Sequence, residues 1–299
     1  MEMSESFTRI LAQTISGIAY GSIYGLFALS VVFLFRANRL FNLAAAELAT
    51  FFTICMFYLL KHMSYLPAFM ITVVLAFIGG VMLHFGLMRV MTERKHVLAS
   101  SEMVITIGLY TILNSLSSIL SEEPERFPVP FSQSVVNFWG VNIPSHSFVI
   151  LGFAFLINLG IYLFLRMTKM GLIVEATAEN LVGARLRGIK TSNILAMAWG
   201  LTTAVSAVAG ILIAPVLFVS SSMLTQVFSY ALIAVVIGGL ESPFGAIVGG
   251  IIVGVVENLA INVGFIGSEL KFLAVFFLLL VVLVIRPRGL WGREEHRRV

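Results

Sequence analysis

The chain has 299 residues, of which 59% are hydrophobic and only 11% charged, and its net charge is +4. Soluble globular proteins carry about 25% charged residues, so this composition excludes an ordinary soluble enzyme. The basic residues lie between apolar runs and at the C-terminus, where membrane topology explains them, so no nucleic-acid partner is expected.

The long uncharged runs predict an all-α, polytopic transmembrane helical bundle. A span needs about 20 apolar residues, which gives about eight to nine spans, and helices satisfy their own backbone groups in lipid. The N-terminal run is too long for a signal-peptide core of about 7–15 residues, so it is expected to remain as a helix. In chain order, the predicted spans are 10–35, 40–60, 65–88, 103–120, 148–165, 194–219, 226–240, 244–263 and 270–285.

Two segments interrupt the regular pattern. The stretch 226–263 contains a break at 238–243, which reads Gly-Gly-Leu-Glu-Ser-Pro. Both flanks are short for a span, so the stretch is predicted to form either two spans or two half-helices around a broken-helix region. The external connection 121–147 is rich in proline and aromatic residues. It is expected either to lie along the membrane surface or to be a simple connector.

The distribution of Lys and Arg predicts the topology. Most of these residues fall in the connections 36–39, 89–95 and 166–193 and in the tail 286–299. All four segments lie on one side of the membrane when 226–263 is counted as two spans. The positive-inside rule places that side in the cytoplasm. We therefore expect a multi-pass membrane protein with a cytoplasmic C-terminus and an outward-facing N-terminus.

Glycines recur at a spacing of four in two of the predicted spans, and a glycine pair opens the break. Small residues at this spacing allow helix backbones to approach closely in lipid. Tight packing is therefore predicted, with subunit association or a moving gate as the alternative. The glycines assigned to packing or gating are Gly17, Gly21, Gly25, Gly238, Gly239, Gly245 and Gly249.

Two carboxylates, Glu47 and Glu257, lie inside otherwise apolar runs. A charge at the centre of a span costs at least about 2.5 kcal/mol, so such a residue faces a polar cavity or has a partner. Asn42, Ala45, Ala46 and Glu47 are candidates for a translocation path. The alternative for Glu47 is a buried, hydrogen-bonded carboxyl that supports a helix break, and a structural role is favoured for Glu257.

No catalytic or nucleotide-binding motif is present. The chain has a single cysteine, Cys55, and lacks a His-Glu-x-x-His zinc motif, a Gly-x-Ser-x-Gly elbow and a P-loop. Its largest internal connection is far shorter than a nucleotide-binding domain of about 100 residues. The chain is therefore not expected to be an enzyme or to hold a cofactor of its own.

The connection 166–193 is the largest segment predicted to be cytoplasmic. Most residues of 172–187 favour a helix, and Gly188 is predicted to end it. A short exposed helix with small residues on one face suits docking into a groove of a partner protein. The alternative is a solvated surface helix.

Several blocks together resemble the branched-chain amino acid permease family of bacterial ABC importers, and most of all the first, shorter of its two permease types. The blocks are 24–29, 41–48, 104–109, 169–189, 234–257 and 286–292. The family usually has His-Gly where this chain has Ala45-Ala46, often Arg where it has Glu175, and a small residue where it has Glu241.

The resemblance implies a single permease domain at 1–299 of a bacterial inner membrane, with 166–193 as its coupling loop. Glu175, Ala176, Ala184 and Gly188 would contact the ATPase. The implied partners are a second homologous permease, two ATPase subunits that bind ATP and Mg, and an extracytoplasmic solute-binding protein. The expected cargo is a branched-chain or other hydrophobic amino acid, followed by urea, short amides or small carboxylates. The rival class is an ion-gradient-driven secondary transporter that uses Glu47 and Glu257.

Overall fold

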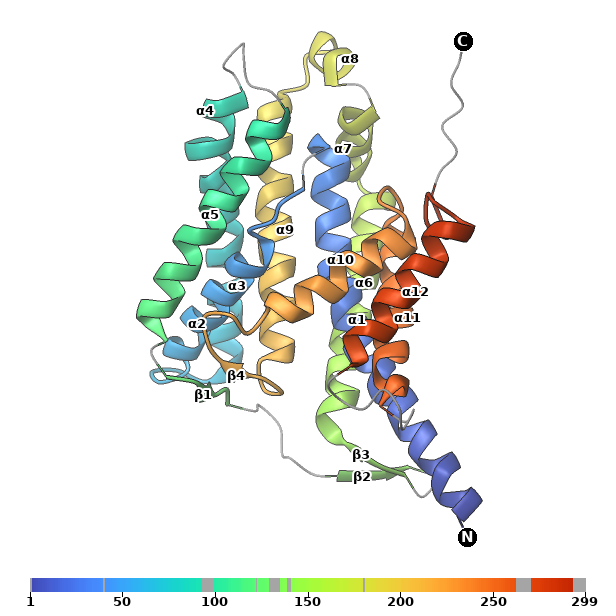
Figure 1. Cartoon of the computed structure of the whole chain (residues 1–299). Helices are drawn as coiled ribbons and strands as arrows, with labels where there is room; N and C mark the ends of the chain where they lie inside the picture. The colour runs from blue at the N-terminus through green and yellow to red at the C-terminus, as the bar shows by residue number, and fades with distance from the viewer. Residues whose placement is uncertain are drawn as a thin grey trace. The chain divides into compact units, whose positions relative to one another are not determined.

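Apolar runs become helices along almost the whole chain in the computed structural model, which describes residues 2–39, 41–92, 99–121, 123–128, 135–138, 141–179, 181–261 and 270–292 (Figure 1). The helices are α1 (Glu2–Asn38), α2 (Ala45–Leu59), α3 (Tyr65–Leu83), the π-helical turn η1 (His84–Met88), α4 (Arg89–Thr92), α5 (Ala99–Leu120), α6 (Ser145–Met167), α7 (Lys169–Glu179), α8 (Leu181–Leu186), α9 (Thr191–Ile213), α10 (Thr225–Gly238), α11 (Pro243–Ala260) and α12 (Lys271–Ile285). The described strands are β1 (Glu125–Arg126), β2 (Val135–Phe138), β3 (Val141–Pro144) and β4 (Phe218–Val219).

The predicted fold class is confirmed, since within the described residues six helices are long and apolar enough to cross a membrane. These six segments are Thr8–Ala37, Tyr65–Met88, Met103–Leu120, Ser147–Phe164, Thr191–Ile213 and Pro243–Ala260. Three shorter apolar helices, α2, α10 and α12, occupy the other predicted segments. Each of the nine predicted spans therefore has a helical counterpart.

Two predicted span boundaries are wrong. The span 194–219 was expected to continue past Ile213, but α9 ends there and Phe218–Val219 forms a strand with Glu125–Arg126. In the predicted span 40–60, the helix α2 begins only at Ala45. Arg39, which has a left-handed backbone with φ 59°, ends α1 before it. Asn42 then accepts a hydrogen bond from the backbone N–H of Ala44 at 3.0 Å, which shapes a turn before α2.

The described parts of the connection 121–147 form short antiparallel strand pairs, which the apolar pattern did not predict. Strand β1 pairs with β4, and β2 pairs with β3. Phe127 is buried in a cluster with Phe57 and Ile211. This end of the connection is therefore fixed by packing, while Pro130 and Trp139 lie outside the described residues.

The break at 238–243 lies between the helices α10 and α11. Gly239 has φ 103°, and the Ser242 side chain caps α11 by accepting a hydrogen bond from the Gly245 N–H at 3.0 Å. Pro243 follows as the first residue of α11, a position that needs no backbone donor. With 14 residues, α10 is about 21 Å long, so it is shorter than a bilayer core of about 30 Å.

The chain divides into two compact units, and each is described separately. One unit comprises 1–32, 131–158 and 229–299, and the other comprises 33–130 and 159–228. We call them the N/C-terminal unit and the middle unit. In the middle unit α9 packs against both α3 and α2, and α2 packs against α5.

Candidate functional site

Glu47 lies in the first turn of α2 in the middle unit and is completely buried. A carboxylate is favourable in a first helical turn, because unpaired backbone N–H groups and the positive end of the helix dipole gather there. Ala45 and Ala46 precede it and are also buried. The turn at Asn42 therefore decides where α2 begins, and with it where Glu47 is held.

Asn114 of α5 is the side-chain partner of Glu47. Its Nδ2 donates to Oε2 of Glu47 and to the backbone carbonyl of Ser221, both at 3.3 Å. The other carboxylate oxygen, Oε1, is buried without a hydrogen-bond partner. Sequence reasoning missed Asn114, although an amide inside the apolar run 103–120 was a signal that could have found it.

Further buried polar atoms without partners lie on the same helices. Thr50 follows Glu47 by one turn on α2, and Ser117 follows Asn114 by one turn on α5, so each pair shares a helix face. The hydroxyls of Thr50 and Ser117 are buried without a partner, as is Nδ2 of Asn42. We call Glu47, Thr50, Asn114 and Ser117 the Glu47 cluster.

The Glu47 cluster offers hydrogen-bond donors and acceptors on helices α2 and α5 of the middle unit. A buried polar group without a partner costs about 1–3 kcal/mol. A polar ligand or water that bonds to these atoms removes that cost. Among the described residues, no group of three His, Cys, Asp or Glu side chains could hold a metal ion. The carboxylate, amide and hydroxyls of the cluster are groups to which a small polar solute can hydrogen-bond.

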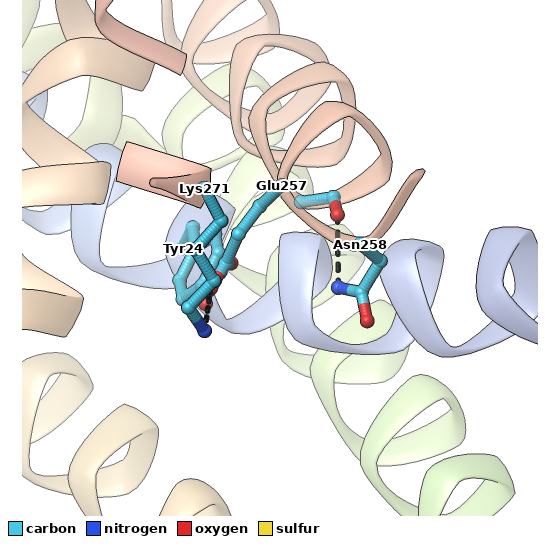
Figure 2. Close-up of polar contacts among 5 residues, drawn as sticks. Tyr24, Glu257, Asn258 and Lys271 are labelled. Atoms are coloured by element: carbon cyan, nitrogen blue, oxygen red, sulfur yellow. Dashed lines mark hydrogen bonds and ion pairs between the residues drawn. The ribbon is translucent and has the colours of Figure 1, made fainter. Parts of the chain in front are cut away.

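Glu257, in the N/C-terminal unit, has a partner on each oxygen (Figure 2). The Tyr24 hydroxyl donates to Oε2 at 2.6 Å, and Nζ of Lys271 contacts Oε1 at 2.7 Å. The neighbouring Asn258 bonds instead to the carbonyl of Gly254 at 3.0 Å. Glu257 thus ties α11 to α1 and α12, and each of its carboxylate oxygens has a partner.

The predicted glycines of α1 lie against the backbone of α11. A Cβ added to Gly17 would lie 2.8 Å from Cα of Val255, and one added to Gly21 would lie 2.7 Å from Cα of Ile251. At Gly25 the nearest backbone atoms belong to Ile247. These separations are shorter than ordinary carbon–carbon contacts, so the two helices fit together only because side chains are absent here.

The glycines at the break hold the C-terminal motif in place. Gly238 and Gly245 contact each other so closely that a Cβ on either would collide with the other's backbone, and Gly249 lies against Ala234 in the same way. The Trp291 N–H donates to the carbonyl of Gly238 at 3.2 Å. The backbone of Gly239 likewise lies next to that of Gly292. Sequence reasoning did not connect this break with the 286–292 block.

The connection 166–193 contains two helices, α7 and α8, where one was predicted over 172–187. Gly188 ends α8 as predicted, with φ 79° and a hydrogen bond from the Ile189 N–H to the carbonyl of Ala184 at 3.1 Å. This is the bond pattern of a glycine-terminated helix. Asn180, which lies between α7 and α8 in the sequence, is outside the described residues.

The predicted coupling residues differ in their surroundings. Ala176 and Gly188 are exposed, whereas Ala184 is buried against the chain itself. The side chain of Glu175 lies outside what the structure describes. Leu172 and Leu186, which the sequence did not single out, are 57% and 85% exposed. The outward surface of the loop is therefore apolar at two large side chains.

Comparison with known proteins gives a family match over most of the chain. The model of the family described as "Branched-chain amino acid transport system / permease component" matches residues 13–285. The chain is 28% identical to the high-affinity branched-chain amino acid transport system permease protein LivH of Escherichia coli (strain K12), over 99% of this chain and 100% of the relative. It is 27% identical to the permease protein BraD of the corresponding system in Pseudomonas aeruginosa, over 97% and 98%.

One solved structure has a similar fold. The structure of PsaBC from Streptococcus pneumoniae in complex with Fab matches 93% of this chain and 92% of its own, with a TM-score of 0.51 and 13% identity. The TM-score supports a shared arrangement of helices, and with identity this low the comparison says nothing about what is transported.

Proposed function

The chain belongs to the branched-chain amino acid transport system permease family, and on that premise we propose that it is the translocation subunit of an ATP-driven ABC importer. The main support for this proposal is that Glu47 is a completely buried carboxylate in an apolar helix and has one oxygen without a partner. A residue of this kind is costly in a membrane and usually marks a solute path.

The proposed cargo is a small polar solute, with branched-chain or other hydrophobic amino acids first, as the names of LivH and BraD suggest. The Glu47 cluster supports this assignment because a carboxylate, an amide and two hydroxyls offer both donors and acceptors to a polar headgroup. Ala45 and Ala46 stand where the family usually has His-Gly, which changes the path beside Glu47. Urea, a short amide or a small carboxylate is the second candidate.

An importer without its own nucleotide site needs partners. We propose that the whole chain acts as one permease domain in a bacterial inner membrane, paired with a second homologous permease. Two ATPase subunits would bind ATP and Mg, and an extracytoplasmic protein would deliver the solute. The loop 166–193 and the tail 286–299 would lie in the cytoplasm, with the ATPase contacting exposed Leu172, Ala176 and Leu186.

An ion-gradient-driven carrier is the rival class, and it would need titratable groups open to the path. Glu257 supports it poorly, because Tyr24 and Lys271 occupy both of its oxygens. Glu47 alone offers an unpartnered carboxylate oxygen among the two buried glutamates. The importer is therefore the better-supported proposal.

The test is uptake by the purified complex in vesicles, with and without ATP. Glu47→Gln keeps the shape of the side chain and removes its charge, and Glu47→Ala removes the group. A hydrogen bond to a charged group contributes about 1.5–3 kcal/mol, so we expect each change to lower uptake by about tenfold or more. Glu125→Gln, the same change at an exposed residue, is the matched control. Uptake that is normal in both Glu47 variants, or that proceeds equally without ATP, would refute the proposal.

A further inference from the structure

Helix α7 presents one buried and one exposed face. Gly171, Val174 and Thr177 are buried at a spacing of three, while Leu172 and Ala176 are exposed. Val174 is 5% exposed and packs in a hydrophobic cluster with Ile194, Ala198 and Trp199 of α9. We call this the Trp199 cluster, and its other buried members are Phe33, Leu34, Ala37 and Met88. The buried face of α7 in the coupling loop thus packs against the first turns of α9.

The opposite part of α9 packs against the helix that carries Glu47. A Cβ added to Gly210 would lie 2.7 Å from Oγ1 of Thr53 and 3.4 Å from the carbonyl oxygen of Ala49. Ala207 lies in a buried cluster with Ala44 and Leu48, which flank Glu47 in the sequence. With 23 residues, α9 is about 34 Å long. Helix α9 therefore contacts both α7 of the coupling loop and α2.

Close packing on α3 stiffens α9 between these two contacts. A Cβ added to Gly80 of α3 would lie 2.8 Å from the backbone carbonyl carbon of Trp199, and one added to Gly200 would lie 2.9 Å from side-chain atoms of Phe77 and Val81. Trp199 itself is completely buried. Interiors packed this tightly have low compressibility and pass a displacement on. The pair α3–α9 is therefore suited to move as one body.

We propose that α9 is the lever that carries movement of the coupling loop to the Glu47 cluster, and that Val174 is the positioning residue through which α7 moves it. The inference rests on the proposed function, because it assigns a route within that importer. When the ATPase displaces α7, the Trp199 cluster shifts α9. Gly210 and Ala207 then shift α2 next to Glu47. Val174 touches neither solute nor nucleotide and acts through Trp199.

The experiment measures solute taken up per ATP hydrolysed by the complete complex in vesicles. Val174→Ala removes the contact with the Trp199 cluster and leaves the outer face of α7 unchanged. We expect the ATPase subunits to co-purify in normal ratio and to hydrolyse ATP, while uptake per ATP falls by about fivefold or more. Val174→Ile keeps a branched side chain in the cluster and should restore most of the ratio. Val275→Ala makes the same truncation at a buried valine of α12 and should keep the ratio of the unmodified complex.

A second variant tests the far end of the lever. Gly210→Ala places a methyl group against Thr53, and we expect the same loss of uptake per ATP with the ATPase still bound. Adding Thr53→Ala removes the oxygen nearest to that methyl group and should recover part of the ratio. Unchanged uptake per ATP in Val174→Ala, or an equal loss in Val275→Ala, would overturn the lever. If the unmodified complex neither binds an ATPase nor uses ATP for uptake, the proposed function fails, and the lever fails with it.

Discussion

The hydroxyl of Tyr24 lies 2.6 Å from Oε2 of Glu257, and this bond joins residues that are 233 positions apart in the sequence. Lys271 neutralises the same carboxylate from the start of α12 at 2.7 Å (Figure 2). A buried charge is tolerated when it is paired and fully hydrogen-bonded, and removing one partner leaves it uncompensated. This arrangement makes Lys271 a stabilising residue of the N/C-terminal unit.

We therefore expect Lys271→Met to destabilise the purified protein by about 1–3 kcal/mol, because Glu257 loses a charged partner. Thermal unfolding in detergent measures the effect. Lys61→Met is the control, since Lys61 is about half exposed and lies 3.9 Å from the equally exposed Glu125. Adding Glu257→Gln to Lys271→Met should recover part of the loss. Equal unfolding temperatures for the Lys271 and Lys61 variants would rule out the stabilising role.

Gly21 is predicted to be intolerant of any side chain. A Cβ there would lie 2.7 Å from Cα of Ile251, so α1 and α11 would have to separate. Overpacking of this kind costs about 1–3 kcal/mol. Gly160→Ala is the matched control, because an added Cβ meets nothing within 4 Å there. Thermal unfolding of both variants should show a clear loss for Gly21→Ala only, and equal stability would contradict the backbone contact.

Asn114 is predicted to act together with Glu47. Replacing Asn114 with Ala removes the donor to Oε2 of Glu47 and to the Ser221 carbonyl. We expect the KM for uptake to rise by about tenfold, since the lost bond involves a charged group. Ser115→Ala, at the exposed neighbouring residue whose hydroxyl bonds to the carbonyl of Thr111, should leave the KM unchanged. In a double variant with Glu47→Gln, the KM should rise by less than the two single effects combined. Strictly additive effects would show that the two residues act independently.

Site-directed labelling tests the topology. After Cys55 is replaced by Ala, a single cysteine at Leu186, which is 85% exposed, or at Glu294 should resist a membrane-impermeant thiol reagent in intact cells. A cysteine at the exposed Glu123, in the connection predicted to be external, should react. Both cytoplasmic positions should react once the membrane is opened. Labelling of Leu186→Cys or Glu294→Cys from outside would reverse the proposed orientation.

The sequence by itself determined where the helices lie and how several of them end. Uncharged runs form helices in a bilayer because its core holds no water, so the backbone groups must hydrogen-bond within the span. The segment 65–88 could therefore be predicted to its ends. The capping signals are equally local. Gly188 ends α8 through its positive φ, and Ser242 with Pro243 begins α11. Glu47 was identifiable as a candidate because a carboxylate in an apolar run needs a polar environment.

Only the tertiary structure decided which residues from distant parts of the chain contact each other. The bonds from Asn114 to Glu47 and from Tyr24 to Glu257 connect distant helices, and no local pattern encodes them. The pairing of β1 with β4 also depends on where two separate segments are brought. The burial of Val174 and Ala184 depends on how the loop 166–193 folds back on its own unit. The periodicity of apolar residues indicates which helix a residue belongs to. Which residue becomes its partner depends on how the helices pack. Packing alone therefore explains why one oxygen of Glu47 has no partner while both oxygens of Glu257 have one.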